Sequence, residues 1–489
     1  MRGLVTLEDL AYLVGRNRLL FTDMSTKRRD FIKLSGLTGL GLISTGLAGC
    51  ASITGASKSP STKKQRFNMS GYAAPKIDRV RIGFIGLGMR GPGAVNRMSH
   101  IEGVDIKGLC DLRPVKVEAV QKSLAGSQHK PLSYSGSEEA WKQLCDRDDI
   151  DLIYICTPWH LHAPMAVYAM EAGKHVAVEV PAALTVDECW QLVETSERTK
   201  KHCMMLENCC YDFFELLTLN MARQGFFGEI IHTEGAYIHD LVGLNFAKNG
   251  YQDMWRLKEN YKNGNLYPTH GLGPVCQVMN INRGDKMEYL TSMASADFHM
   301  AKKAEELAAK DDFYKEYVGK EFRGNMNTTS IRTANGRTIM IQHDVSSPRP
   351  YSRLHVISGT EGFAQKYPEP AKIAKGESFV SAEEFKKLEK QYTPEIVKKV
   401  GEMAKQIGGH GGMDFMMDWR LIDCLRNGLP LDQDVYDAAS WSVIAPLSIW
   451  SVSNRSNSID VPDFTAGSWK SNRPVDLTLN GGGTTGVHV

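Results

Sequence analysis

The sequence lacks the spacings that mark common metal sites. It contains no CxxC pair and no HExxH motif, so neither a structural zinc site nor a zincin-type catalytic site is expected. It also has no long basic run and no basic stripe with interleaved aromatic residues, and its net charge is only +2. These absences exclude the usual basic type of nucleic-acid-binding protein.

Long apolar runs are missing as well. The small-residue apolar stretch at 34–49 is too short to span a bilayer as a helix. With 489 residues, of which 42% are hydrophobic and 23% charged, the chain resembles an ordinary globular protein. Its length predicts two domains with appendages.

The cysteines do not form a complete disulfide framework. One of the ten, Cys50, belongs to the export signal described below, and the remaining nine are an odd number. Cys110 and Cys156 lie inside apparent buried strands. We therefore expect free buried thiols, which suit a protein that folds in the cytoplasm before export.

The N-terminus is typical of an exported lipoprotein. Residues 25–33 (STKRRDFIK) resemble a twin-arginine signal, and Leu47-Ala48-Gly49-Cys50 resembles a bacterial lipobox whose cysteine is lipidated after cleavage. The alternative is an arginine pair that falls by chance before a buried helix. Residues 1–23 fit no signal, which makes Met24 a possible start. We predict a signal over 1–50, a lipid anchor at Cys50 on a bacterial membrane (periplasmic or surface face), and a flexible linker over 51–78.

A glycine-rich turn organises the rest of the chain. An apolar run ending at Ile85 enters Gly86-Leu87-Gly88-Met89-Arg90-Gly91, and helical spacing follows. This is the pattern of a strand, turn and helix that bind a dinucleotide pyrophosphate. Asp111 ends the next apparent strand, where a carboxylate would bind the ribose of NAD and disfavour NADP. The alternative is an ordinary tight turn.

Strand and helix patterns alternate from 79 to 207. This alternation predicts a Rossmann-type, doubly wound parallel sheet whose ligand-binding residues lie at the carboxyl ends of the strands. Two such ends carry Trp159-His160-Leu161-His162 and Glu179-Val180. Since His160 and His162 have no third ligand, we expect them to pack against the cofactor, and we expect no metal.

The pattern changes after residue 208. Period-two segments at 229–239, 287–299, 327–333, 337–345 and 352–358 predict an open antiparallel sheet in an α+β substrate-binding domain over 208–475. Helices at 412–427 and 434–452 are expected to pack on this sheet. The glycine-rich tail, 476–489, is expected to be disordered.

Several motifs together resemble a known family. The turn at 86–91, Thr157-Pro158, E-x-P at 179–181 and the stretch 428–462 are similar to the glucose–fructose oxidoreductase and inositol dehydrogenase family. Within it, the runs GLGMRGPGAV, EVPAALTVDECWQLVE, YQDMWRLKEN, NLYPTHGLGPV and GGHGGMDFMMDWRLIDCLRNGLP resemble glycoside hydrolase family 109, the NAD-dependent α-N-acetylgalactosaminidases. One departure from the wider family is Val180, where its dehydrogenases usually carry lysine.

The resemblance implies roles for individual residues. Substrate contacts are implied at Tyr237, Arg256, Tyr267 and Tyr351, although the tyrosines could cap a core and Arg256 could be a surface charge. His270 could likewise be only a helix-start residue. The implied cofactor contacts are Met89, Arg90, Asp111, Trp159, His160, Leu161, His162, Glu179, Val180, Asn208, Tyr267, Pro268, Thr269 and His270.

Three functions remain: an NAD-using glycosidase, a net sugar oxidoreductase and a non-catalytic sugar-binding lipoprotein. An exported enzyme has no ready supply of nicotinamide cofactor, which favours a reaction that leaves NAD unchanged. The expected mechanism is oxidation at carbon 3, elimination, water addition and re-reduction, which needs no paired carboxylates. The first deprotonation is assigned to His270, and polarisation or proton transfer to Tyr267. The expected partner is a glycan or glycoside with terminal N-acetylgalactosamine. The sequence does not decide whether the protein forms a homo-oligomer.

Overall fold

The structure, a computed structural model, describes residues 64–488. The predicted signal over 1–50, with Met24 and Cys50, and the linker residues 51–63 lie outside the described residues. The described residues belong to one compact unit. No helix within 64–488 combines the length and apolar character needed to cross a bilayer.

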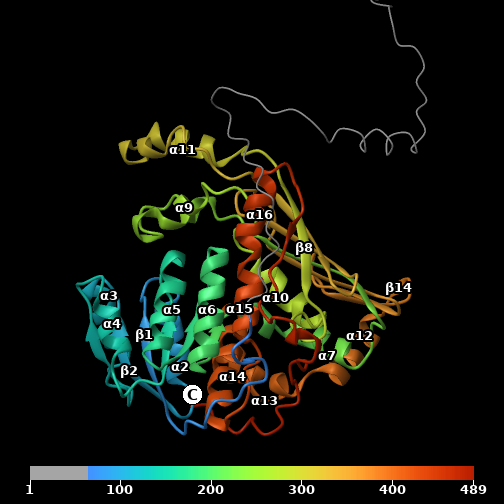
Figure 1. The fold of residues 1–489 in the computed structure, drawn as a ribbon. Helices are drawn as coiled ribbons and strands as arrows, with labels where there is room; N and C mark the ends of the chain where they lie inside the picture. Colours follow the sequence, from blue (N-terminus) through green and yellow to red (C-terminus); the bar gives the residue numbers. More distant parts are fainter. Residues whose placement is uncertain (1–63, 489) are drawn as a thin grey trace, which may run out of the picture. The chain divides into compact units, whose positions relative to one another are not determined.

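The first domain contains a six-stranded sheet in which every neighbouring pair is parallel. Its order, β3-β2-β1-β4-β5-β6, confirms the predicted Rossmann-type fold and reverses direction between β1 and β4, where such sheets bind ligands. All residues of β4 and β5 are buried, because helices cover both faces (Figure 1). The strands are β1 (Val80–Ile85), β2 (Val104–Cys110), β3 (Leu132–Tyr134), β4 (Leu152–Ile155), β5 (His175–Val178) and β6 (Cys203–Met205). The helices are α2 (Gly91–Ser99), α3 (Pro114–Ser123), α4 (Ala140–Cys145), α5 (His162–Glu171) and α6 (Val186–Thr199), with a 3₁₀ turn η1 (Trp159–Leu161).

The second domain contains a nine-stranded sheet in the order β14-β13-β12-β11-β7-β10-β9-β8-β15. It is mixed rather than purely antiparallel, because β7 lies between β10 and β11 and pairs parallel with β10 and antiparallel with β11. The other pairs are antiparallel, as predicted. The strands are β7 (Ile230–Ile238), β8 (Met287–Ala294), β9 (Asn327–Thr333), β10 (Thr338–Asp344), β11 (Ser352–Gly359), β12 (Gly362–Gln365), β13 (Lys372–Lys375), β14 (Ser378–Phe379) and β15 (Ile459–Asp460).

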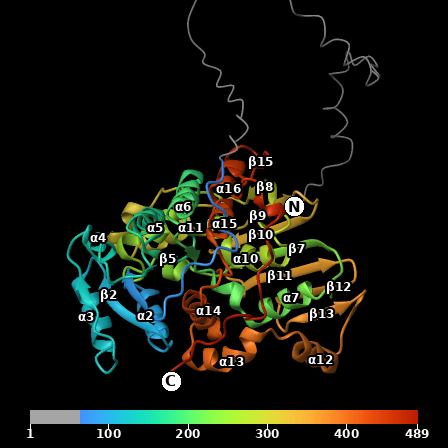
Figure 2. The same cartoon turned by 60° about the horizontal axis from the view of Figure 1, so that its bottom comes forward.

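The C-terminal helices connect the two domains instead of packing only on the second sheet. Helix α16 lies on β8, as expected, whereas α14 contacts α2 and β1, and α15 contacts α6 and β6 (Figure 2). Every residue of α14 from Met413 to Leu425 is buried, so this helix needs partners on all sides. These helices and their neighbours are α7 (Phe213–Arg223), α10 (Thr269–Val278), α12 (Ala382–Tyr392), α13 (Glu395–Ile407), α14 (Met413–Asn427), α15 (Val435–Ser442) and α16 (Ile444–Ser453), with η2 (Asn208–Tyr211), η5 (His410–Gly412) and η6 (Ser468–Lys470).

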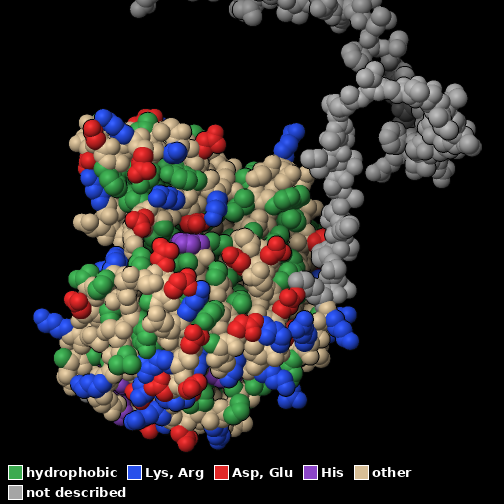
Figure 3. Space-filling model, turned by 60° about the vertical axis from the view of Figure 1, so that its left-hand side comes forward, with side chains coloured by type: hydrophobic (Ala, Val, Ile, Leu, Met, Phe, Trp, Pro, Cys, Tyr) green, Lys and Arg blue, Asp and Glu red, His purple; other side chains and the backbone are tan. Residues whose placement is uncertain are grey.

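A small lobe has a hydrophobic core of its own. It comprises α8 (Val242–Asn245), η3 (Gln252–Met254), α9 (Trp255–Glu259), α11 (Met300–Ala308) and η4 (Asp312–Tyr317). Figure 1 shows α9 and α11 above the ends of α5 and α6. Figure 3 shows a hollow between this lobe and the domain below, with a histidine in it.

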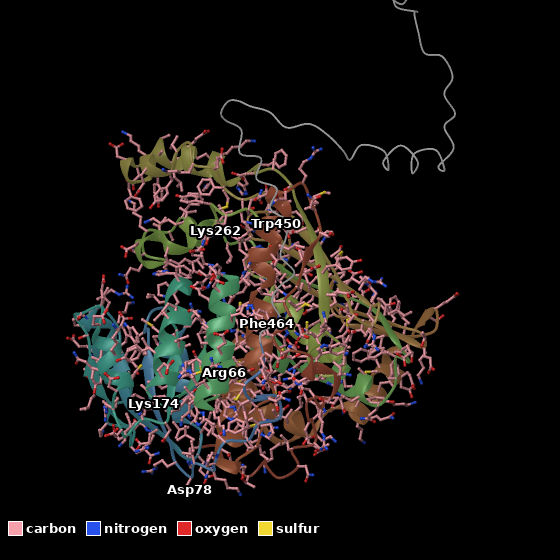
Figure 4. The ribbon with its side chains drawn as sticks, viewed as in Figure 1. Arg66, Asp78, Lys174, Lys262, Trp450 and Phe464 are labelled. Atoms are coloured by element: carbon pink, nitrogen blue, oxygen red, sulfur yellow. The ribbon has the colours of Figure 1, made fainter. Side chains whose placement is uncertain are left out.

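Both predicted flexible ends are packed where the structure describes them. On the linker side, the backbone N–H of Arg66 donates to Glu197 on α6 (2.8 Å), and Met69 is buried (Figure 4). The prediction of a disordered tail is wrong for residues 476–488. The Trp419 indole donates to the carbonyl of Thr485 (3.1 Å), and Val487 forms a bridge with Ile101, so the backbone of this segment is tied to folded structure.

Candidate functional site

The glycine-rich turn has the geometry that its spacing predicts. Gly86 has φ of +90°, and a Cβ there would lie 2.7 Å from the carbonyl of Cys156. A Cβ on Gly91 would lie 2.1 Å from the carbonyl oxygen of Gly86, so the turn and α2 need glycine at both positions. Gly88 faces open space, since its nearest atom, Arg113 Nη2, would be 4.0 Å away. The turn therefore leaves room for a pyrophosphate at the start of α2.

Asp111 ends β2 beside this turn. Its buried carboxylate accepts from the backbone N–H of Leu87 (2.8 Å) and from that of Arg113 (2.9 Å). The carboxylate thus orders the loop and places a negative group where a ribose would lie. These residues fit NAD, because a carboxylate accepts from ribose hydroxyls and repels a 2′-phosphate.

The ends of β4 and β5 are joined through His162. Its ring nitrogens lie 2.7 Å from the carbonyl oxygen of Pro181 and 2.8 Å from that of Thr157. His162 is buried and fastens the two loops, while His160 is exposed and Leu161 half-buried. Val180 lies buried between these loops.

Two aspartates that the sequence analysis missed hold this edge together. Asp414 bonds to Arg90 (3.1 Å) and to the amide of Asn208 (2.5 Å), and Asp418 forms an ion pair with Arg97 (2.7 Å). Arg90 also pairs with Glu179 (2.9 Å). Three predicted cofactor residues, Arg90, Glu179 and Asn208, therefore belong to one network of polar contacts. Burial raises the pKa of Asp418 to about 6 despite Arg97. The sequence carried a signal for this pair, because carboxylates at i and i+4 lie on one face of a helix.

Helix α10 is pressed against β7 at two glycines. A Cβ on Gly271 would lie 2.2 Å from the backbone nitrogen of Ala236, and one on Gly235 would lie 2.3 Å from the carbonyl oxygen of Gly271. This backbone-to-backbone contact brings His270 next to Tyr237, with ring centroids 5.2 Å apart. The sheet therefore sets the position of the predicted base.

His270 forms a hydrogen-bonded pair with Glu207, which the sequence analysis did not single out. Its Nδ1 lies 2.7 Å from a carboxylate oxygen of Glu207, whose side chain is fully buried. Burial raises the pKa of Glu207, but the interaction with His270 and the hydrogen bonds from Thr269 and Cys209 together outweigh burial, and the pKa lies below its usual value. An ionised carboxylate only accepts, so Nδ1 carries the proton and Nε2 has a free lone pair. Within residues 64–488, Nε2 has no hydrogen-bond partner.

The predicted tyrosines form one aromatic wall around this histidine. Trp159 stacks on Tyr267 with centroids 5.4 Å apart, and Tyr237 lies 4.8 Å from Tyr267. Tyr351 extends the wall at 6.2 Å from Tyr237 and is 37% exposed. Burial raises the pKa of Tyr267 well above its ordinary value, so its hydroxyl stays protonated and can donate.

Arg256 lies over this wall. Its guanidinium is 5.0 Å from the ring of Trp159 and 5.1 Å from that of Tyr267, and it donates to the hydroxyl of Tyr251 (3.1 Å). No carboxylate within 64–488 forms an ion pair with it. A half-buried cation held by rings and tyrosine hydroxyls, with no carboxylate partner among the described residues, keeps donors for a ligand.

His410 stands at the start of α14 on a left-handed stretch. Residues 408–412 all have positive φ, and His410 is the single non-glycine among them, with φ of +47°. Its Nδ1 lies 2.9 Å from Asp414. A strained residue in such a stretch is typical of a functional site.

The structure thus brings most of the predicted residues into two adjoining groups. The glycine turn with Met89, Arg90 and Asp111 forms one end, where Met89 is exposed. Trp159, Tyr237, Arg256, Tyr267, His270 and Tyr351 form the other. Pro268 and Thr269 begin α10 and fix the start of the helix that carries His270. The functional candidates missed from the sequence are Glu207, His410, Asp414 and Asp418.

Two family models match the chain. Residues 80–207 match the oxidoreductase family with an NAD-binding Rossmann fold, and residues 211–471 match the C-terminal domain of glycosyl hydrolase 109. A glycosyl hydrolase family 109 protein of Bacteroides fragilis is 51% identical over 421 residues, covering 82% of this chain and 88% of that protein. Two proteins named alpha-N-acetylgalactosaminidase are also similar. That of Bacteroides fragilis is 52% identical (82% and 95% coverage), and that of Shewanella oneidensis is 45% identical (92% and 98%).

Solved structures share the fold at low identity. A levoglucosan dehydrogenase in complex with NADH and L-sorbose matches with a TM-score of 0.59 and 18% identity, covering 79% of this chain and all of that one. An aldose–aldose oxidoreductase of Caulobacter crescentus matches with a TM-score of 0.56 and 15% identity (78% and 99% coverage). At such identities the match supports the architecture only.

Proposed function

Because this chain belongs to glycosyl hydrolase family 109, we propose that it removes terminal α-linked N-acetylgalactosamine from glycans and uses NAD without consuming it. The observation that carries the proposal is a direct contact between residues of the two domains. The Glu207–His270 pair and its tyrosines come from the second domain, and Trp159 at the strand ends of the dinucleotide-binding domain stacks directly on Tyr267. The name of the similar Bacteroides and Shewanella proteins supports the choice of sugar.

The residues at the glycine-turn end of the site fit NAD. Gly88 leaves the turn open, and Asp111 offers its carboxylate at the end of β2. NAD, when bound, supplies reversible acceptance of hydride from carbon 3 of the sugar. Val180 stands where dehydrogenases of the wider family usually carry lysine, and an aliphatic side chain cannot transfer a proton. This substitution disfavours the alternative, a net NAD-dependent sugar oxidoreductase.

The chain's own residues perform the proton transfers. Nε2 of His270 takes the proton of the carbon-3 hydroxyl, and the Glu207 carboxylate stabilises the resulting imidazolium. Tyr267 donates a hydrogen bond to the oxygen at carbon 3 because its phenol stays protonated. A carbonyl at carbon 3 acidifies the hydrogen on carbon 2, so the glycosidic oxygen can leave carbon 1 by elimination. His410 is the second imidazole available for later proton transfers.

Arg256 and the tyrosines orient the sugar. Arg256 has donors for the acetamido carbonyl or a hydroxyl, and Tyr237 and Tyr351 offer rings and hydroxyls to the pyranose. A non-catalytic sugar-binding protein would need the aromatic wall but not the Glu207–His270 pair. The pair therefore favours an enzyme.

The protein purified without added cofactor tests this function. We expect NAD, identified by mass after heat release, together with hydrolysis of an aryl α-N-acetylgalactosaminide and no accumulation of NADH. NADP in place of NAD, or one NADH formed per sugar turned over, would contradict the proposal.

Export remains part of the proposal. We propose that the twin-arginine signal carries the folded, NAD-loaded protein across the membrane and that lipidated Cys50 anchors it. The variant Cys50→Ser should move the protein from the membrane fraction to the soluble fraction. A variant that stays membrane-bound would refute the anchor.

A further inference from the structure

Three side chains beside the catalytic base have the composition of a zinc site. The carboxylate of Glu207, Sγ of Cys209 and a ring nitrogen of His270 all lie within 4.8 Å of one another. Glu207 and Cys209 are fully buried or nearly so, and the His270 side chain is 14% exposed. Carboxylate, thiolate and imidazole are the ligands that Zn²⁺ takes in proteins.

From this cluster we propose an inhibitory Zn²⁺ site formed by Glu207, Cys209 and His270. No assigned role uses Cys209, whose buried free thiol lies on η2 two residues after Glu207, the N-cap of this turn. Its own backbone N–H donates to the Glu207 carboxylate (3.1 Å), which fixes the position of Sγ relative to that carboxylate. A fourth ligand would be water or a sugar hydroxyl from the open side of His270.

The geometry requires only a small opening. Glu207 and His270 Nδ1 now share a hydrogen bond of 2.7 Å. Bonds of about 2.0–2.1 Å around a tetrahedral zinc ion separate two such ligand atoms by about 3.3 Å. The Glu207 oxygen and Nδ1 therefore need to separate by less than about 1 Å, and Sγ of Cys209, which lies within 4.8 Å of both, needs to approach the ion. Metal binding releases the thiol proton of Cys209 to solvent and displaces the proton on Nδ1.

The expected consequence is inhibition. With Nδ1 bound to the metal, the single ring proton that it carried is transferred to Nε2, which then has no lone pair for the sugar hydroxyl. This consequence depends on the proposed role of His270 in glycoside cleavage. Metal binding itself does not, so the two can be measured separately.

The binding experiment uses the purified full chain and Co²⁺, a spectroscopic probe for zinc sites. We expect a cobalt–thiolate charge-transfer band in the wild type and in Cys210→Ser, a control that removes the adjacent buried thiol outside the cluster. Cys209→Ser should lose the band and bind Zn²⁺ more than about tenfold more weakly. A wild type without the band, or a band that persists in Cys209→Ser, would overturn the site.

The activity experiment uses ZnCl₂ with an aryl α-N-acetylgalactosaminide. Zn²⁺ should inhibit the wild type and Cys210→Ser, and a chelator should restore both, whereas Cys209→Ser should be at least about tenfold less sensitive. Equal sensitivity of Cys209→Ser would place the inhibitory metal elsewhere and overturn the inhibitory role. If the wild type shows no glycosidase activity, the proposed function fails, and the cobalt band still decides whether the site exists.

Discussion

The substitution Glu207→Gln tests the catalytic pair most sharply. The amide keeps the size of the side chain and can still accept from His270 Nδ1, but it removes the buried negative charge 2.7 Å away. The carboxylate stabilises the imidazolium that forms when Nε2 takes the proton of the sugar hydroxyl, and a neutral amide stabilises it less.

The expected fall in kcat follows from the hydrogen bond between Glu207 and His270. A hydrogen bond to a charged group contributes about 1.5–3 kcal/mol, and about 1.4 kcal/mol corresponds to a factor of ten in rate. We therefore expect kcat of Glu207→Gln to fall by about 10–10²-fold.

The assay is hydrolysis of an aryl α-N-acetylgalactosaminide from low to neutral pH, with bound NAD and the thermal unfolding midpoint measured in parallel. The matched control is Glu234→Gln, which removes a half-buried carboxylate of β7 that pairs with His232 rather than His270. An unchanged kcat in a Glu207→Gln protein that still binds NAD would refute the reasoning.

Three further predictions concern other parts of the molecule. Gly271→Ala places a methyl group 2.2 Å from the backbone nitrogen of Ala236, so it should separate α10 from β7. The expected cost is about 1–3 kcal/mol in the free energy of unfolding with a loss of activity, and Gly243→Ala, in open space, is the control. Arg256→Met should raise KM at least about tenfold and leave bound NAD unchanged, and an unchanged KM would remove Arg256 from the sugar site. Burial lowers the pKa of His202 to about 4. The folded state thus keeps this ring neutral, and stability present above pH 6.5 is lost as the pH falls toward 4, by up to about 3 kcal/mol. In denaturant titrations, His202→Phe should lose less free energy of unfolding than the wild type as the pH falls. An unchanged dependence of this free energy on pH would contradict the role given to His202.

The first domain could be predicted closely because its signals are local. The alternation of strands and helices predicted over 79–207 corresponds to β1 to β6 and their helices, and the glycine turn and Asp111 lie where their spacing placed them. In the second domain, the period-two pattern located the strands β7 to β11. It could not show that β7 and β10 run parallel, since strand direction depends on which segments meet across the sheet.

The missed site residues depend on contacts between distant segments. In the sequence, Glu207 looks like an ordinary residue after a strand. Its contact with His270 depends on the packing of Gly273 against it, since a Cβ on Gly273 would lie 2.8 Å from Cγ of Glu207. The tail was misjudged for a related reason. Glycine-rich composition suggests disorder, but Gly483 and Thr485 donate to the buried carboxylate of Asp423, which no local pattern reveals.

The fate of the hydrogen on carbon 2 of the sugar tests the central claim most directly. We propose hydrolysis in heavy water, followed by measurement of deuterium in the recovered N-acetylgalactosamine. Oxidation at carbon 3 and elimination make that hydrogen exchange with solvent, so the product should carry deuterium at carbon 2. Hydrolysis by a pair of carboxylates leaves that position untouched. A product without deuterium at carbon 2 would contradict the account.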